Sequence, residues 1–253
     1  MFIDTHAHLF KEYYNDLDSV ILECLNNGVS KIIVSGCDIA SNKEVLELVN
    51  KYDCIYGTLG FHPSELDGFK DEYFDWLEEN INNNKIVGIG EIGLDYHYED
   101  TNRELQKTIF KRQLDIASKN EKPIIVHSRD AVGDTYNILK DYKLRGSIHA
   151  FSGSVEMAHE FIKLGYMIGV GGVVTFKNAK NIKEVVKSVP LAYILLETDS
   201  PYLTPEPYRG EINSSKNISF IANKIAVLKE ASIVDVSRVT SDNAERIFDF
   251  SSK

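Results

Sequence analysis

Short apolar segments alternate with segments of helical spacing along almost the whole chain. Eight segments have the length and composition of buried strands: 1–8, 31–35, 54–59, 85–90, 122–127, 146–149, 166–170 and 193–197. Apolar residues recur at helical spacing in the segments 16–27, 41–51, 72–81, 102–118, 132–142, 155–164, 179–189, 219–229 and 232–250. Strands that alternate with helices form a parallel sheet, and eight such units favour an α/β fold, a closed (β/α)8 TIM barrel, over an open doubly wound sheet.

No linker interrupts this alternation. The chain has 253 residues and no Gly/Ser-rich or Pro-rich segment between blocks, so we expect a single domain over residues 1–253. The longest irregular stretch, 199–217, contains three prolines and a glycine. We expect it to form a loop over the mouth of the barrel.

Charge and cysteine content exclude several classes of protein. A net charge of −10 argues against binding nucleic acid through a broad basic surface. The odd number of cysteines, Cys24, Cys37 and Cys54, indicates buried or half-buried thiols in a reducing cytoplasm. No secretory signal or membrane-spanning apolar run is evident, so we expect a cytoplasmic protein without a membrane partner.

Polar side chains that bind metals follow the predicted strands. The carboxyl ends of six predicted strands carry His6 and His8, His62, Glu91, His127, His149, and Glu197 with Asp199. Barrel enzymes build their active sites at this rim. The sequence therefore predicts that these side chains converge from distant parts of the chain.

The residue types suit a centre with two divalent ions. We expect His6, His8 and Asp199 to hold one ion and His127 and His149 a second. Glu91 has the two oxygens needed to bridge them. Zn²⁺ and Mn²⁺ suit such mixed ligands, and Mg²⁺ is tolerated. Two ions acidify a shared water and clamp the oxygens of a displacement, with Asp199 as general base.

Other polar residues receive supporting or no roles. Glu197 and Asp95 are expected to orient ligands rather than bind metal. Asp4 lies on the same face of its strand as His6, so an orienting role and a structural role both stay open for it. His97 lies in a polar loop and His159 on a helix of mixed character, so we expect neither to take part.

Six motifs resemble a known family in order along nearly the whole chain. They are His6-Ala-His8, Gly60-Phe-His62-Pro63, Gly90-Glu91-Ile-Gly-Leu-Asp95-Tyr, His127-Ser-Arg129, His149-Ala-Phe-Ser-Gly153 and Glu197-Thr-Asp199-Ser-Pro-Tyr202-Leu. This set resembles the TatD family of metal-dependent deoxyribonucleases among the amidohydrolase-like barrels. The resemblance implies two-metal hydrolysis of DNA phosphodiesters as a 3′ to 5′ exonuclease. It implies the same metal ligands: His6, His8, Glu91, His127, His149 and Asp199.

The resemblance also implies the groups that contact substrate phosphate: His62, Arg129, Tyr202 and Arg209. One loop departs from the family pattern Arg-Gly-Lys-x-Asn-Glu-Pro. Here Glu211 stands in place of the lysine, and Ser214 and Ser215 in place of Glu-Pro. A carboxylate at this point leaves the identity of the substrate and the order of the loop open.

Two other functions stay open. A water activated by two metal ions can attack a carbonyl carbon as well as phosphorus, so the same barrel can hydrolyse esters or amides. One such reaction is the removal of D-amino acids from tRNA, which the resemblance to the family also implies as an alternative. A non-catalytic binding protein is the third possibility, although such a protein would have no need to retain six metal ligands.

Overall fold

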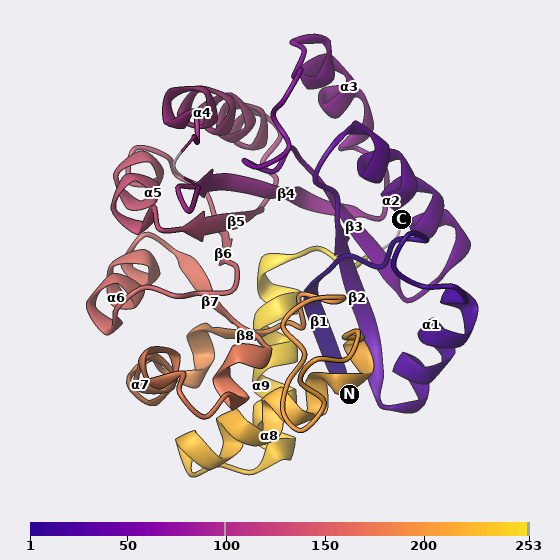
Figure 1. The fold of residues 1–253 in the computed structure, drawn as a ribbon, viewed down its shortest axis with the longest axis vertical. Helices are drawn as coiled ribbons and strands as arrows, with labels where there is room; N and C mark the ends of the chain where they lie inside the picture. Colours follow the sequence, from indigo (N-terminus) through magenta and orange to yellow (C-terminus); the bar gives the residue numbers. More distant parts are fainter. Residues whose placement is uncertain (99, 252–253) are drawn as a thin grey trace.

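The computed structural model describes residues 1–98 and 100–251. Eight parallel strands form one sheet in the order of the sequence, and Figure 1 shows them around a central axis with helices outside. The strands are β1 Phe2–Ala7, β2 Val29–Ser35, β3 Ile55–Leu59, β4 Ile86–Asp95, β5 Ile124–Arg129, β6 Gly146–Ile148, β7 Tyr166–Val170 and β8 Ile194–Leu196. The predicted (β/α)8 barrel is therefore confirmed.

Every predicted helix is present in the described part of the chain. The helices are α1 Leu17–Asn26, α2 Ile39–Lys51, α3 Glu72–Asn80, α4 Arg103–Lys119, α5 Val132–Leu139, α6 Val155–Lys163, α7 Lys180–Ser188, α8 Ile218–Lys229 and α9 Ile233–Ile247. Three short 3-10 helices, which the sequence pattern did not reveal, are η1 Gly172–Thr175, η2 Leu191–Tyr193 and η3 Ser215–Asn217.

The end of strand β4, its register and the start of helix α2 differ from the sequence expectation. Strand β4 continues past Glu91 to Asp95, so Glu91 lies inside the strand rather than at its end. The register of β4 against β5 shifts between Ile89 and Ile92, a bulge that apolar patterning does not reveal. Helix α2 begins at Ile39, two residues before the predicted segment 41–51, and is capped by Asp38, whose carboxylate accepts the Ser41 backbone N–H.

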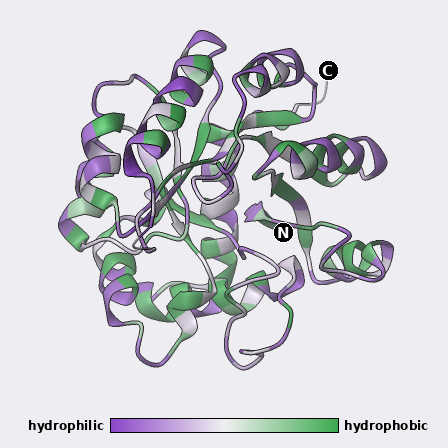
Figure 2. Ribbon diagram, turned by 45° about the horizontal axis from the view of Figure 1, so that its top comes forward, coloured by the Kyte–Doolittle hydropathy of each residue, from purple (hydrophilic) through white to green (hydrophobic). Residues whose placement is uncertain are grey.

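The last helix also ends earlier than its pattern suggests, because the residues after it close the bottom of the barrel. Inward-facing residues of the strands, among them Ile33, Ile125 and Leu195, pack against Ile247 and Phe248. A second, larger cluster lies between the strands and the surrounding helices. Figure 2 shows this arrangement as hydrophobic strands enclosed by helices with one hydrophobic and one hydrophilic face.

The segment after β8 joins the last strand to the first. The Thr5 hydroxyl donates to the Leu196 carbonyl at 2.9 Å, and the backbone N–H of Asp199 donates to His6 O at 3.0 Å. The His8 N–H donates to the Ser200 carbonyl at 2.6 Å. The two segments that carry the first and last predicted metal ligands are thus bonded to each other.

The long loop between Asp199 and Asn217 is anchored through Asn213. The Asn213 amide donates to the carbonyls of Thr198 and Tyr202 at 2.9 and 2.7 Å, and Tyr14 donates its hydroxyl to Asn213 O. Gly172 lets this loop approach η1 closely, because a Cβ there would lie 1.9 Å from the Leu203 carbonyl oxygen. In the described residues, we find no helix with the length and hydropathy of a membrane span.

Candidate metal centre

The six predicted metal ligands meet at the carboxyl end of the barrel. His6 is within β1 and His8 just after it, Glu91 is within β4, and His127 is within β5. His149 follows β6 directly, and Asp199 lies three residues after β8. All six side chains are buried or nearly so, which explains why each needs a polar partner.

The two histidines of β1 point at the same carboxylates. His6 Nε2 and His8 Nε2 lie 3.0 Å apart. They are 3.3 and 3.4 Å from Glu91 Oε2, and 3.5 and 3.6 Å from Asp199 Oδ1. Ring nitrogens and carboxylate oxygens from three strands therefore converge on one point.

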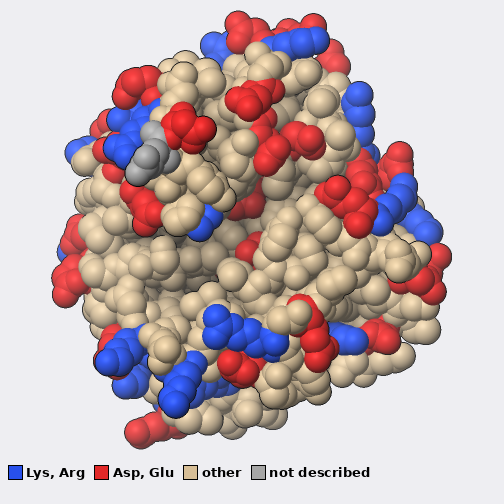
Figure 3. Space-filling view, viewed as in Figure 1, with Lys and Arg blue, Asp and Glu red and all other residues tan. Residues whose placement is uncertain are grey.

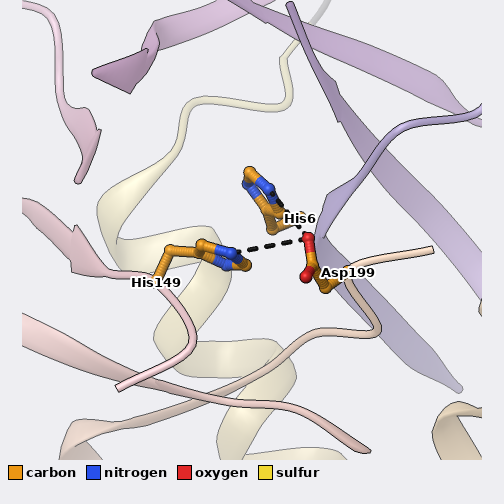
Figure 4. Close-up of side chains that lie close together, drawn as sticks. All are labelled: His6, His149 and Asp199. Atoms are coloured by element: carbon orange, nitrogen blue, oxygen red, sulfur yellow. Dashed lines mark ion pairs between the residues drawn. The ribbon is translucent and has the colours of Figure 1, made fainter. Parts of the chain in front are cut away.

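His149 joins this group from the opposite side of the barrel. Its Nε2 lies 3.5 Å from Asp199 Oδ1, and its ring centroid lies 3.7 Å from that of His6. Figure 4 shows His6 and His149 directed at the same Asp199 carboxylate. On its other edge, His149 Nδ1 lies 3.0 Å from Glu197 Oε1.

The second oxygen of Glu91 faces a different pair of histidines. His127 Nδ1 lies 2.8 Å and His62 Nε2 3.6 Å from Glu91 Oε1. His149 Nε2 is farther, at 3.9 Å. The structure thus brings His127 together with His62, whereas His149 lies with His6 and Asp199.

Within the described residues, three groups of side chains each place their ligand atoms within 4.8 Å of one another. They are His6, His8 and Glu91; His6, His149 and Asp199; and His62, Glu91 and His127. Glu91 belongs to two of these groups through different oxygens, which is the arrangement expected of a bridging ligand.

Outer partners hold the histidine rings so that one nitrogen faces the centre. The Ser35 carbonyl accepts from His8 Nδ1 at 3.0 Å, which leaves the lone pair of the neutral ring on Nε2. Asp95 accepts from Nε2 of His127 at 3.0 Å, and Glu197 lies 3.0 Å from Nδ1 of His149 as an ion-pair partner. The donor set therefore fits divalent metal ions.

Charge in the cluster shifts the pKa values of its members. Burial raises the pKa of the Glu91 carboxyl, but the surrounding histidines outweigh this and hold it well below its usual value. The pKa of Asp199 is likewise lowered against burial, chiefly by His149. Burial lowers the pKa of His149, but Glu197, Asp199 and Glu91 raise it to about 10. The carboxylates are ionised at neutral pH, as metal ligands must be.

A cavity of about 650 Å³ opens above the cluster. Of the residues expected to contact substrate, His62, Arg129 and Tyr202 line it. Arg209 does not line it in the described structure; its guanidinium lies 4.3 Å from the ring centroid of Phe176. The arginine is therefore displaced from the other three groups.

The three residues that depart from the family pattern, Glu211, Ser214 and Ser215, lie outside this cavity. Glu211 lines a separate groove with Glu23 and Lys216. Ser214 and Ser215 are buried, and the Ser214 hydroxyl lies 3.4 Å from Cys24 Sγ. The Glu211 carboxylate therefore lies away from the residues that line the larger cavity.

Sequence reasoning missed two neighbours of the first histidine pair. Ser35 at the end of β2 contacts both rings, through its hydroxyl at 3.1 Å from His6 Nδ1 and its carbonyl at His8 Nδ1. Cys37 Sγ lies 3.7 Å from His8 Nδ1. The only sequence signal was their position at the end of the second strand, the same signal that revealed the histidines.

The residues expected to stay outside the centre do so. His97 is exposed and its Nδ1 pairs with Asp130 at 3.0 Å, whereas His159 is half-buried and its Nε2 lies 2.9 Å from the Ser188 hydroxyl. Asp4 is fully buried and accepts the Thr198 backbone N–H at 2.9 Å, which fastens β1 to the segment after β8. The three cysteines are free, with Cys24 buried and the others half-buried, as expected.

Comparison with known proteins agrees with this geometry. Residues 3–249 match the family described as TatD related DNase. An uncharacterized metal-dependent hydrolase of Bacillus subtilis, YabD, is 40% identical over 252 residues, which cover 98% of this chain and 99% of the relative.

Solved structures give the same result. YjjV, a TatD homologue from Escherichia coli K12, superposes with a TM-score of 0.93 at 31% identity, covering 98% of this chain and 97% of YjjV. A TatD family hydrolase of Entamoeba histolytica has a TM-score of 0.87 at 25% identity, covering 99% and 98% of the two chains. The chain therefore belongs to the TatD-related DNase family.

Proposed function

We propose that this protein is a metal-dependent hydrolase that cleaves phosphodiester bonds of DNA, removing nucleotides from the 3′ end. The observation that carries the proposal is Glu91, whose two oxygens face two separate groups of histidines, at 3.3 Å from His6 and 2.8 Å from His127. A carboxylate so placed would hold two divalent ions through its two oxygens, and Mg²⁺, Mn²⁺ and Zn²⁺ are the candidates.

The ligands would be His6, His8, Glu91, His127, His149 and Asp199, supported by Glu197 and Asp95. Bound divalent ions would acidify a water and polarise the phosphoryl oxygen. The Asp199 side chain is 14% exposed and ionised, so it can accept the proton of a water that enters from the cavity.

Two side chains in the cavity wall suit the binding of phosphate. Arg129 lines the cavity and presents a forked set of donors, with its guanidinium 5.9 Å from the ring centroid of Tyr98. His62 contacts Ser64 through Nδ1 at 2.7 Å, which directs its other nitrogen toward Glu91 and the centre. These groups orient a phosphodiester but supply little charge, so DNA binding depends on the metal-loaded centre.

A cleavage assay tests the proposal. The purified protein is incubated with single-stranded DNA labelled at its 5′ end, in the presence of Mg²⁺, Mn²⁺ or Zn²⁺, and products are resolved by length. We expect a ladder that shortens one nucleotide at a time from the 3′ end. Absence of cleavage with all three metals would refute the proposal.

Two further measurements, deacylation of D-aminoacyl-tRNA and analysis of bound metal, separate the alternatives left open by the sequence. A higher rate of deacylation on D-aminoacyl-tRNA than of cleavage on DNA would assign an ester hydrolase. If neither substrate is turned over and metal analysis after reconstitution finds no bound ion, a non-catalytic binding role takes its place.

A further inference from the structure

A second, apolar pocket adjoins the metal centre. It has a volume of about 300 Å³ and lies between the segments after β6 and β7, the start of α7 and Leu203. Its apolar wall consists of Phe151, Val173, Ile182 and Leu203. Asp199 lines both this pocket and the larger cavity, so a molecule bound here touches the centre directly.

One cation lines this pocket, and three more gather around Phe176 in the loop that leads to it. Lys180 lines it, and Lys183 donates from Nζ to the Phe176 carbonyl. Arg209 stacks over the Phe176 ring, and Lys177 is the next residue. Among the described residues none of these four cations forms an ion pair, whereas Lys187 on the same helix pairs with Glu184 at 2.8 Å. Figure 3 shows basic side chains gathered over α7 and the neighbouring loop.

The opposite edge of the centre has the reverse charge. Glu12, Asp38 and Glu65 line the larger cavity on the side of α2 and the loop after β3. A polyanion approaching the centre is therefore repelled from this edge and attracted to the side of α7. The charge distribution gives the substrate strand a preferred side in a protein whose net charge is −10.

We propose that the apolar pocket binds the base of the nucleotide whose phosphate lies at the metal centre, and that Lys177, Lys180 and Arg209 bind the adjacent backbone. This proposal rests on the proposed function and names its substrate subsite. The pocket accommodates one base, so the strand enters unpaired. The exposed Asn178 and Ser152 at its rim offer polar contacts to base edges without restricting the pocket to one base.

Binding of mononucleotides tests the subsite without relying on turnover. Calorimetric titration of the Mn²⁺-loaded protein compares dTMP and dAMP with deoxyribose 5-phosphate, which lacks only the base. We expect both nucleotides to bind at least roughly tenfold more tightly than deoxyribose 5-phosphate, because stacking of one base contributes a free energy of that order. Equal affinity of all three would overturn the proposal even if the protein cleaves DNA. Tighter nucleotide binding without cleavage would support the subsite and refute the DNase function.

A substitution that narrows the pocket provides the matched comparison. Val173 is half-buried in the pocket wall, whereas Val227 is 65% exposed on α8 and lines neither cavity. Val173→Phe should abolish the advantage of the nucleotides and leave binding of deoxyribose 5-phosphate unchanged; Val227→Phe should change neither. If Val173→Phe retains the full advantage, the base does not occupy this pocket.

The basic residues are tested by salt dependence. Lys180→Ala should weaken binding of a short single-stranded oligonucleotide and reduce the slope of log affinity against log salt by roughly 0.7, the value for one contact to single-stranded phosphate. Lys187→Ala on the same helix is the control and should leave the slope unchanged, because Glu184 already neutralises that lysine. Identical slopes for Lys180→Ala and the unaltered protein would contradict a backbone path along α7.

Discussion

Glu197 supports His149 from behind: the Oε1 atom of this fully buried carboxylate lies 3.0 Å from His149 Nδ1. The same oxygen accepts the Ala150 backbone N–H at 2.6 Å, so the carboxylate also fixes the turn that follows β6. The two contacts hold the ring with Nε2 toward Asp199 and stabilise its charged form.

Glu197→Gln should therefore weaken the centre without unfolding the protein. The amide keeps the shape and can keep the Ala150 contact, but it loses the charge that polarises His149. We expect a loss of about 10–100-fold in metal affinity and activity, the effect typical of such outer partners. Calorimetric titration with Mn²⁺ measures it, and unaltered affinity would show that Glu197 only packs the barrel.

Gly169 leaves room for this carboxylate. A Cβ at Gly169 would lie 2.4 Å from Glu197 Oε2, whereas one at Gly133 on α5 meets nothing within 4 Å. Gly169→Ala should lower stability by about 1–3 kcal/mol, as overpacking of a core does. Gly133→Ala should not, since alanine favours helix. Thermal melts compare the two; equal midpoints would mean that Glu197 moves aside freely.

Replacement of Glu91 or of Asp199 by alanine should stop turnover. Glu91→Ala and Asp199→Ala remove atoms shared by several histidines, so we expect losses beyond the roughly 10–100-fold of an outer partner. Circular dichroism should show an intact barrel, because neither side chain belongs to a hydrophobic cluster. If either variant is unfolded, the loss of activity no longer supports a direct role.

His159→Ala serves as the control for these substitutions. This histidine is half-buried on α6, in the outer layer of helices, and its Nε2 lies 2.9 Å from the Ser188 hydroxyl. Its removal should leave the rate of DNA cleavage within about twofold, since surface substitutions away from sites cost little. A large loss would place substrate on the outer face of the barrel.

The convergence of the six predicted ligands followed from the sequence, because their positions depend on the β/α alternation, which apolar patterning reveals well. Glu91 was expected at a strand end, and the bulge that keeps it inside β4 arises from pairing with β5. Arg209 was expected to contact substrate phosphate together with His62 and Arg129, but its guanidinium lies over the Phe176 ring and outside the cavity that those two residues line. The position of such a loop depends on contacts between residues that are distant in sequence, such as the hydrogen bond from the Asn213 amide to the Thr198 carbonyl.

The sequence also could not predict that His127 shares Glu91 Oε1 with His62 rather than with His149. Strand parity says that a side chain points inward, but the depth of each ring depends on where its strand ends. Strand β6 ends at Ile148, whereas β5 continues to Arg129. His149 therefore follows the end of its strand and reaches Asp199, while His127 lies within its strand beside Asp95.

Metal affinity should rise with pH. Without metal, burial lowers the pKa of His149 but its carboxylate neighbours raise it to about 10, so the ring is protonated at neutral pH. A cation must displace that proton, so affinity should increase by up to about tenfold per pH unit between about pH 6 and 8, with proton release. Calorimetry in buffers of different ionisation enthalpy measures both; a pH-independent affinity without proton release would argue that His149 stays outside the coordination sphere.

The central claim is a two-metal centre bridged by Glu91, and anomalous diffraction from crystals soaked in Mn²⁺ tests it most directly. We expect two anomalous peaks roughly 3.5–4 Å apart, one beside His6 and His8 and one beside His127, with the Glu91 carboxylate between them. A map with no peak at these residues, or with peaks only at surface carboxylates, would contradict the account.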